Sequence, residues 1–267
     1  MDCLIVNNLI CQIADDIESH AAFREFDGQI SSDFGSAYAT QDRVVAELIK
    51  RGTRGSICGY KIALNAKTLL EHFGVSEPIS GQLFKDQMHQ SSVELLSDSY
   101  RCLLIEPEIA AIMGRDLKAG YGKHDRESVL PAIAMFVPAL ELVDTRDAHI
   151  PDLQLTTAIA QNITNEGLVI GGPGIRPHNL DVDNLDVTIT FDDAPVAELN
   201  GAAPQHPLDA LVWLANHLEL SDKHLKAGQV VLCGSHMPPK PIGTAKHIYA
   251  DMGIMGDVEF TIQPGNN

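Results

Sequence analysis

The sequence predicts an α+β fold, with helices early in the chain and strands dominating the remainder. Near the N-terminus, apolar residues recur at helical spacing (Leu4, Ile5, Leu9, Ile13 and Ile17). From residue 101 onward, apolar runs typical of strands follow one another at 101–105, 109–112, 135–143, 167–171, 185–192, 229–234 and 257–263. Because the two kinds of segment do not alternate strictly, we expect α+β and not α/β.

The individual elements follow from local patterns. Residues 1 to about 26 are expected to be helical, and a second amphipathic helix, AYATQDRVVAELIKRG, ends at Gly52. CGYKIALNA (58–66) is expected to be a strand, KTLLEHFG a short helix ended by Gly74, and residues 207–220 the clearest late helix. Since neither a repeat nor a linker is evident, we expect residues 1–267 to form a single catalytic domain, with a mainly helical part at about 1–57.

Composition excludes several classes of function. A net charge of −17 over 267 residues would repel a polyanion, so we expect no nucleic-acid partner. No apolar stretch reaches the length of a membrane span, and MDCLIVNNLICQIADD lacks the basic start of a signal peptide. The five cysteines are odd in number and lack C-x-x-C spacing, which favours reduced thiols and a cytoplasmic protein.

Two glutamates, Glu106 and Glu108, lie two apart in the otherwise apolar run RCLLIEPEIAAIMGR. On a strand such residues share one face, about 6.5 Å apart. One interpretation is a strand whose glutamates face water, because carboxylates are mostly exposed. The apolar flanks favour a buried strand, where like charges at about 4 Å would repel by about 4 kcal/mol at an effective dielectric near 20. A buried pair would need a cation between the carboxylates, or a proton on one of them.

A third carboxylate, Glu141, lies in the equally apolar FVPALELVD. Its neighbours Leu140 and Leu142 would point to the opposite face of a strand. Three carboxylates and water suit Mg²⁺ or Mn²⁺, which take oxygen ligands in octahedral geometry. A softer metal would be expected to recruit His or Cys.

Lys61 lies inside the apolar strand CGYKIALNA. A buried lysine is unfavourable unless it is paired or its pKa falls. In a site for an anionic substrate, Lys61 could bind a carboxylate or donate a proton. The alternative is a surface lysine whose stem covers apolar neighbours.

Further candidates are weaker on their own. Asp144 and Arg146 form either a local ion pair at a strand end or a support for Glu141 from outside the metal's coordination sphere. In VVLCGSHMPPKPI, a strand meets Gly-Ser, which exposes backbone N–H groups and the Ser235 hydroxyl to a substrate carboxylate. His236 could be a base, although most exposed loop histidines are not. The sequence lacks a G-x-G-x-x-G dinucleotide motif and a G-x-S-x-G elbow.

Several segments, in order along the chain, resemble the 2-keto-4-pentenoate hydratase and 4-oxalocrotonate decarboxylase group of the fumarylacetoacetate hydrolase superfamily. The resemblance runs from about residue 36 to 263. No one segment is decisive, but together they are highly specific. They are AYATQ, GYKIAL, SGQLF, EPEIAAIMGRDL, ALELVDTR, VIGGPG, HPLDALVWLANHL and LKAGQVVLCGS.

The resemblance implies a mixed β-sheet rolled into a barrel-like body with peripheral helices, and a homo-oligomer. It implies that Glu106, Glu108 and Glu141 bind Mg²⁺ or Mn²⁺, and that Lys61 is a catalytic residue near a 2-oxo acid. The substrate-binding residues that it implies are Leu83, Asn162, Thr164 and Ser235. A complex with a related pathway enzyme is a further expectation.

This chain departs from the family pattern at two places. Family hydratases commonly carry Asp where this chain has Ile79, and a D-N-A-S-S-G-like loop where it has QNITNEG (161–167). Gln161 thus replaces an acid, while Asn162 and Thr164 keep an amide and a hydroxyl. The departures concern proton transfer and leave the metal ligands intact. Glu77 is a candidate replacement for the missing acid.

We expect the protein to be a metal-dependent lyase. The reaction that we favour is hydration of 2-hydroxypenta-2,4-dienoate in aromatic meta-cleavage catabolism. Decarboxylation of 4-oxalocrotonate or a related 2-oxo diacid is the alternative. Two further alternatives stay open. One is an acylpyruvate C–C hydrolase, for which His20 and Glu25 are the candidate pair, and the other is a non-catalytic partner subunit. The three glutamates and Lys61 argue against the last.

Overall fold

The computed structural model of the chain describes residues 3–118 and 123–265. Its helices are α1 (Cys3–Glu18), α2 (Phe34–Arg51), α3 (Lys67–Phe73), α4 (Arg126–Val129), α5 (Leu155–Ala160) and α6 (Pro207–Glu219). Its strands are β1 (Ile57–Ala63), β2 (Ile79–Phe84), β3 (Met88–Gln90), β4 (Val93–Leu96), β5 (Leu103–Met113), β6 (Ile133–Asp144), β7 (Asn165–Ile170), β8 (Gly172–Pro173), β9 (Asp186–Phe191), β10 (Ala194–Asn200), β11 (Val230–Ser235), β12 (Lys240–Pro241), β13 (His247–Asp251) and β14 (Gly256–Gln263).

The helix ends carry capping residues, of which Gly52 and Gly74 were expected from the sequence. The Asp33 carboxylate accepts the N–H of Ser36 at 2.7 Å at the start of α2, and Gly52 ends that helix in the left-handed region. Gly74 ends α3 in the same way. The first helix is shorter than expected, because α1 ends at Glu18 and not near residue 26. None of the helices within the described ranges is long and apolar enough to cross a membrane.

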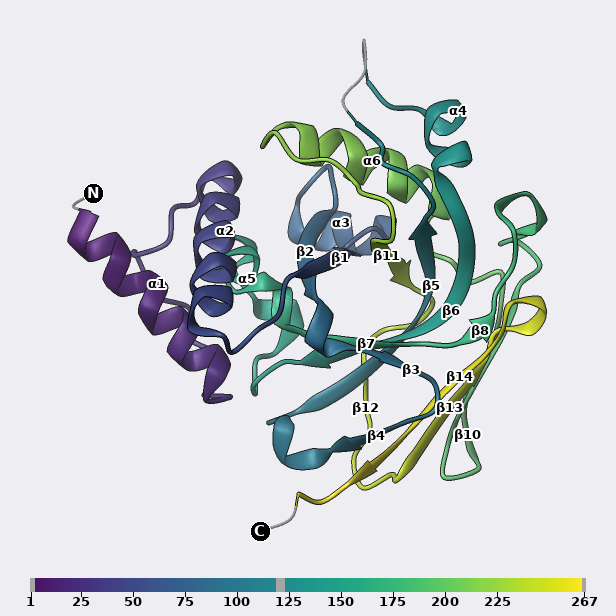
Figure 1. Cartoon of the computed structure of the whole chain (residues 1–267). Coiled ribbons are helices and arrows are strands. Elements are labelled where there is room, and N and C mark those ends of the chain that lie inside the picture. The colour runs from purple at the N-terminus through teal and green to yellow at the C-terminus, as the bar shows by residue number, and fades with distance from the viewer. Residues whose placement is uncertain (1–2, 119–122, 266–267) are drawn as a thin grey trace.

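The strands form two mixed sheets. The larger has the order β2-β1-β11-β5-β6-β7-β3, with β12 beside β5, and the smaller has the order β10-β9-β13-β14-β4, with β8 beside β14. In the larger sheet β1–β11 and β3–β7 are parallel, whereas β1–β2, β11–β5, β5–β6 and β6–β7 are antiparallel. Figure 1 shows α1, α2 and α5 on one side of the body and the smaller sheet on the other.

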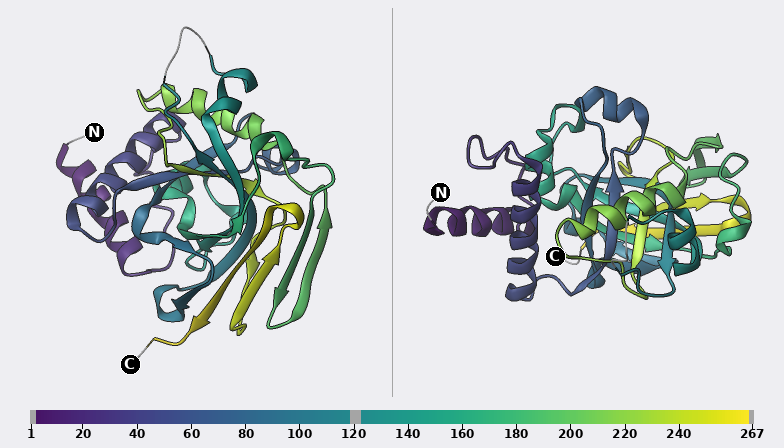
Figure 2. Two further views of the ribbon diagram at one scale, coloured as in Figure 1. Left: turned by 45° about the vertical axis from the view of Figure 1, so that its right-hand side comes forward. Right: turned by 90° about the horizontal axis from the view of Figure 1, so that it is seen from above.

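The predicted α+β class and the mixed sheet are confirmed, whereas the barrel-like rolling is not confirmed. The strand pairing of the described residues leaves two separate sheets and no hydrogen-bonded ring. The larger sheet does curl, as the bend of its long strands in the left view of Figure 2 shows. Its end strand β2 is joined to the segment before β7 by a side chain: the amide of Asn162 accepts the N–H of Gln82 at 2.7 Å and donates to its carbonyl at 2.8 Å.

The two faces of the larger sheet have different roles. The outer face packs against the smaller sheet and α6 in the main apolar core, which includes Ile105, Ile109, Leu140, Val231, Val187, Ile248, Phe260, Leu211 and Leu214. The opposite, inner face carries a smaller apolar cluster that includes Leu83, Ala110, Ala139, Leu168 and Leu232. Because side chains alternate along a strand, Glu106 and Glu108 share the inner face with Ala110.

Candidate metal centre

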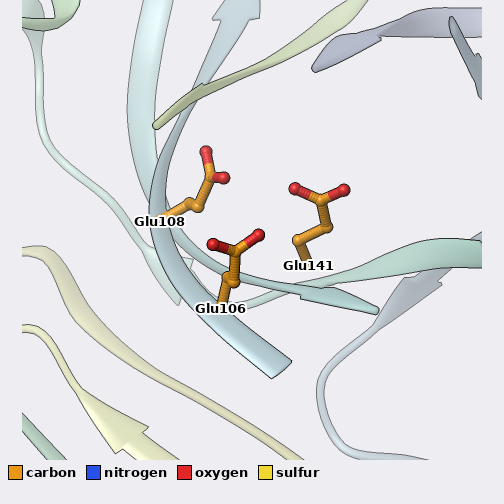
Figure 3. A group of neighbouring side chains, drawn as sticks. All are labelled: Glu106, Glu108 and Glu141. Carbon is orange, nitrogen blue, oxygen red and sulfur yellow. The ribbon is translucent and has the colours of Figure 1, made fainter. Parts of the chain in front are cut away.

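Three glutamates converge on the inner face of the larger sheet (Figure 3). Glu106 of β5 and Glu141 of β6 are directly opposite each other in the antiparallel ladder, and Glu108 follows one pleat along β5, opposite Ala139. Each of the three offers a carboxylate oxygen, and these oxygens all lie within 4.8 Å of one another. The sequence therefore correctly indicated a buried strand whose two glutamates meet a third carboxylate.

Lys61 reaches the same place from β1. Its Nζ lies 2.9 Å from Oε1 of Glu141, and both side chains are almost fully buried. Gly81 is opposite Lys61 in the β1–β2 ladder, and a Cβ there would lie 3.3 Å from Lys61 Cγ. The small residue thus leaves the lysine room to extend along the inner face. The alternative of a surface lysine is excluded by this burial.

The three carboxylates and one ammonium carry a formal charge of −2, and all of these side chains but the half-buried Glu106 are buried. Burial, reinforced by the charge of Glu141, raises the pKa of Glu106 to about 8. The same causes raise the pKa of Glu108 well above its ordinary value. Burial alone would lower the pKa of Lys61, but the neighbouring carboxylates, Glu141 first, outweigh it and leave it raised. A divalent cation would balance this charge and keep the carboxylates ionised.

Two hydrogen bonds fix which oxygens remain free. The N–H of Gly234 donates to Oε2 of Glu108 at 2.7 Å. The amide of Asn165 donates to Oε1 of Glu141 at 2.9 Å. Oε2 of Glu141 is buried and has no hydrogen-bond partner among the described residues. Three hard oxygen donors with an unsatisfied buried oxygen fit Mg²⁺, Mn²⁺ or Ca²⁺.

The four residues expected to contact substrate differ in their surroundings. Leu83 lies on the inner face with Lys61, in the apolar cluster near the glutamates. Ser235 is opposite Glu108 in the β5–β11 ladder, and its hydroxyl donates to the Met237 carbonyl at 2.6 Å.

Asn162 and Thr164 occupy a short turn in the left-handed region. The Asn162 amide is committed to the backbone of Gln82, as described above. Thr164 borders a small cavity, with room for about one water, that Arg54, Arg146 and Asn165 also line.

Asp144 is the last residue of β6 and Arg146 follows two residues later, and no described contact joins either side chain to Glu141. Asp144 accepts backbone N–H groups of Arg101 at 2.7 Å and of Cys102 and Arg146 at 2.9 Å. Arg146 donates to Gln161 Oε1 at 2.6 Å. Any support for Glu141 therefore acts through the backbone of β6. Because Gln161 stands where the family commonly has an acid, the partner of the buried Arg146 side chain is a neutral amide.

The other candidate acids and bases do not contact the three glutamates in the described part of the chain. His20 Nδ1 is 3.7 Å from Asp144. Glu25 shows no described contact with the three glutamates. His236 is buried beside the carbonyl of Pro107, whose side chain points away from the face of the glutamates. Glu77 is exposed and lines a surface groove with Pro78, so the structure does not bring it to Lys61.

Two residues that hold the glutamates were not foreseen in that role. Gly234 was singled out as part of a turn for a substrate carboxylate, but its N–H is directed at Glu108. Asn165 was not singled out, although it lies in the QNITNEG loop, the second of the two places where the chain departs from the family pattern. In the sequence, the only signal for Asn165 was its polar side chain, shortly before the apolar run of β7.

Ile79 lies in the sheet that carries the site, in an apolar cluster separate from that of the inner face. Its position in β2 places it on the same face as Gly81 and Lys61. It is almost fully buried in a cluster with Ala37, Ile159 and Ile163. No acid therefore occupies the β2 positions that share a face with Lys61, which are Ile79, Gly81 and Leu83.

The fold and the site together define a protein whose curled mixed sheet brings three glutamates and a lysine together as a candidate centre for a divalent metal. Residues 87–263 match the family described as fumarylacetoacetate (FAA) hydrolase C-terminal. The chain belongs to the fumarylacetoacetate hydrolase family, as the resemblance of its segments indicated.

Among curated relatives, the chain is 31% identical over 229 residues to 2-oxo-hept-4-ene-1,7-dioate hydratase of Escherichia coli. That match covers 83% of this chain and 84% of the hydratase. It is 32% identical over 203 residues to 2-keto-4-pentenoate hydratase of Paraburkholderia xenovorans, covering 76% and 74%. Among solved structures, 4-oxalocrotonate decarboxylase from Pseudomonas putida, complexed with magnesium and adipate, superposes with a TM-score of 0.86 at 21% identity. That match covers 98% of this chain and 99% of the other, and it shows the shared fold.

Proposed function

We propose that the protein is a divalent-metal-dependent lyase of short 2-oxo or 2-hydroxydienoate acids, and that it hydrates 2-hydroxypenta-2,4-dienoate. The observation that carries the proposal is the convergence of the half-buried Glu106 with the buried Glu108 and Glu141, and the pairing of Lys61 with Glu141. The names of the curated relatives, which are hydratases, support the same reaction.

The three glutamates would hold Mg²⁺ or Mn²⁺. A bound ion supplies Lewis-acid polarisation of a 2-oxo group and its neighbouring carboxylate. The chain's own contribution beside it is the Lys61 ammonium, which stabilises negative charge on the C2 oxygen or moves a proton there. Leu83, with the apolar cluster of the inner face, packs against the hydrocarbon part of the substrate and keeps bulk water out.

In the proposed hydration, the dienol first ketonises to an α,β-unsaturated 2-oxo acid. Water then adds to the carbon of the double bond that lies farther from the 2-oxo group. Asn162, Thr164 and Ser235 are proposed to contact the substrate through their backbone or side-chain polar groups. We further propose that residues 1–267 form a single catalytic domain and that the protein is a cytoplasmic homo-oligomer. We also propose that it can form a complex with a related enzyme of aromatic meta-cleavage catabolism.

Decarboxylation of 4-oxalocrotonate or a related 2-oxo diacid is the second candidate, and Ile79 favours it. Adding water requires a group that activates it, and the neighbours of Lys61 on β2 carry no such group. Loss of CO₂ requires none: the electrons of the broken C–C bond pass to the conjugated C2 oxygen, and one proton is then returned. Lys61 can supply that proton.

An ultraviolet assay separates the two reactions. Metal-stripped protein is offered 2-hydroxypenta-2,4-dienoate and 4-oxalocrotonate separately, with and without Mg²⁺ or Mn²⁺. Metal-dependent loss of the first chromophore supports hydration, and loss of the second supports decarboxylation. If neither is consumed while the protein still binds metal, the lyase proposal is wrong, and acylpyruvates become the next substrates to test.

Ile79→Asp sharpens this comparison, because it restores the acid common in family hydratases. It should raise the ratio of hydration to decarboxylation. Ile159→Asp, in the same apolar cluster but on α5, is the matched control for burying a carboxylate there. It should not change the ratio.

A further inference from the structure

We propose that Asn165 is a positioning residue of the metal centre, which directs one defined oxygen of Glu141 toward the metal. The inference rests on the metal centre of the proposed function, and not on which reaction that centre performs. Asn165 would set the affinity for the metal without touching the substrate.

The contacts of Glu141 divide its two oxygens. Oε1 receives two donors, the Lys61 ammonium and the Asn165 amide, each at 2.9 Å. Oε2 receives none from the described residues and is fully buried. A carboxylate held by two donors on one oxygen can rotate only by breaking both contacts. The free oxygen is therefore the one available to the cation, as in metal sites where a polar partner orients a ligand.

The orientation of the Asn165 amide is itself determined. The N–H of Gly167 donates to Oδ1 of Asn165 at 3.2 Å. Only the carbonyl end of the amide can accept that bond, so the NH₂ end must face Glu141. Asn165 therefore presents a donor to the carboxylate in either protonation state of its neighbours.

A bulge in β7 places Asn165 there. The β6–β7 register pairs Leu142 with Gly167 and Val143 with Asn165, so Glu166 has no partner in the ladder. Without this extra residue, Glu166 would lie opposite Val143, on the same face as Glu141. A fourth carboxylate would then point into the metal centre.

The bulged Glu166 is held outside the centre by its own partners. Its Oε2 lies 2.8 Å from Arg54 Nη2 and 2.8 Å from Gln87 Nε2. Gly167 accommodates the distortion, because its φ is +132° and a Cβ would lie 2.6 Å from the Gln87 carbonyl oxygen. The bulge thus exchanges a carboxylate for an amide at the position next to Glu141.

The test is the affinity for Mn²⁺, measured as free ion by electron paramagnetic resonance. Asn165→Leu removes the donor at similar volume and should weaken Mn²⁺ binding by about tenfold, because a ligand-orienting contact is lost. At saturating Mn²⁺, any turnover of the wild type should largely return. Asn165→Ala removes the donor without branching and serves if the Leu variant does not fold.

Asn200→Leu is the matched control. The Asn200 amide also donates to a carboxylate, that of Asp186 at 2.8 Å, but on the exposed strand β10 of the other sheet. It should leave Mn²⁺ affinity unchanged.

If both Asn165 variants bind Mn²⁺ as wild type does, even with reduced thermal stability, Asn165 is merely structural and the inference is overturned. A wild type that binds no divalent ion would overturn it as well, together with the metal centre. A wild type that binds Mn²⁺ but turns over neither dienoate removes the proposed function and leaves this inference intact.

Discussion

Glu106 and Glu141 occupy directly opposite positions of the antiparallel β5–β6 ladder, so that two like charges share one cross-strand pair. Like charges directly opposite each other destabilise a sheet. With Glu108 one pleat away, the larger sheet contains a position that is unfavourable for folding and favourable for binding a cation. Stability and metal binding should therefore respond in opposite directions to changes at these residues.

Glu106→Gln should make the metal-free protein more stable than the metal-free wild type. Added Mg²⁺ should stabilise the variant less than it stabilises the wild type. Gln removes a carboxyl that beside Glu141 must either repel as an anion or take up a proton at its raised pKa, and a gain of about 1–2 kcal/mol would raise the metal-free Tm by about 2–6 °C. The affinity for Mg²⁺ should fall by about 100-fold or more, because a ligand is lost. Thermal unfolding with and without Mg²⁺ measures both effects.

Glu198→Gln is the control for this change, because Glu198 is an exposed glutamate on β10. It should alter neither the Tm nor the stabilisation by Mg²⁺. If Glu106→Gln instead lowers the metal-free Tm, the opposed carboxylates are not a source of repulsion.

Lys61→Met should lower kcat by about 10²–10⁴, the usual contribution of a proton-transferring side chain. It also leaves Glu141 without its ammonium partner, and breaking a buried ion pair destabilises by about 3–5 kcal/mol. Added Mg²⁺ should recover most of this stability, because it supplies positive charge to the same carboxylates. Lys67→Met, at an exposed lysine of α3, is the control. Full activity of Lys61→Met would disprove the assigned role.

The fold class and most core strands were predictable because their signals are local. The apolar runs that flank Glu106, Glu108 and Glu141 place these residues on buried strands. The short strands β3, β4, β8 and β12 were missed, and so were β2, β10 and β13, whose segments contain Gly, Pro or polar residues. The division into two sheets depends on long-range pairing that one sequence does not express.

The convergence of Glu106, Glu108 and Glu141 was predictable from residue type, spacing and family resemblance, but the residues that orient their side chains were not. Asn165 reaches Glu141 only because Glu166 is bulged out of the ladder. Gly234 donates to Glu108 only because β11 lies beside β5 in a particular register. Both contacts are set by register between strands more than 20 residues apart in the chain.

The pair of His20 and Asp144 should make stability depend on pH. The Asp144 carboxylate, 3.7 Å away, raises the pKa of His20 above its ordinary value, with a smaller contribution from the charge of Glu166. The stabilisation by protonated His20 is therefore fully present below about pH 6.5 and is lost as the pH rises through its higher folded pKa.

His20→Gln should accordingly reduce the free energy of unfolding most near pH 5.5, and the difference from wild type should shrink by pH 8.5. Urea unfolding of metal-free protein at a series of pH values measures it. His178→Gln, at an exposed histidine, should show no such trend. A difference that is the same at both pH values would mean that His20 does not stabilise through its charge.

Gly234→Ala should weaken metal binding through the backbone. Gly234 has a φ of +114°, and a Cβ there would lie 2.4 Å from the Asn65 side chain, whose amide donates to the Cys233 carbonyl at 2.8 Å. The peptide must therefore move, and with it the N–H that donates to Glu108. Mg²⁺ affinity, measured by calorimetry, should fall by about 10- to 100-fold.

Gly228→Ala separates this effect from backbone strain alone. Gly228 lies just before β11 with a φ of +82°, but a Cβ there would meet nothing within 4 Å. The substitution should destabilise by about 1 kcal/mol, because an L-residue is strained in that region. Its Mg²⁺ affinity should match wild type, since no N–H to a metal-binding carboxylate is displaced. Equal losses of affinity in the two variants would show that general destabilisation, and not the Gly234 N–H, controls the metal centre.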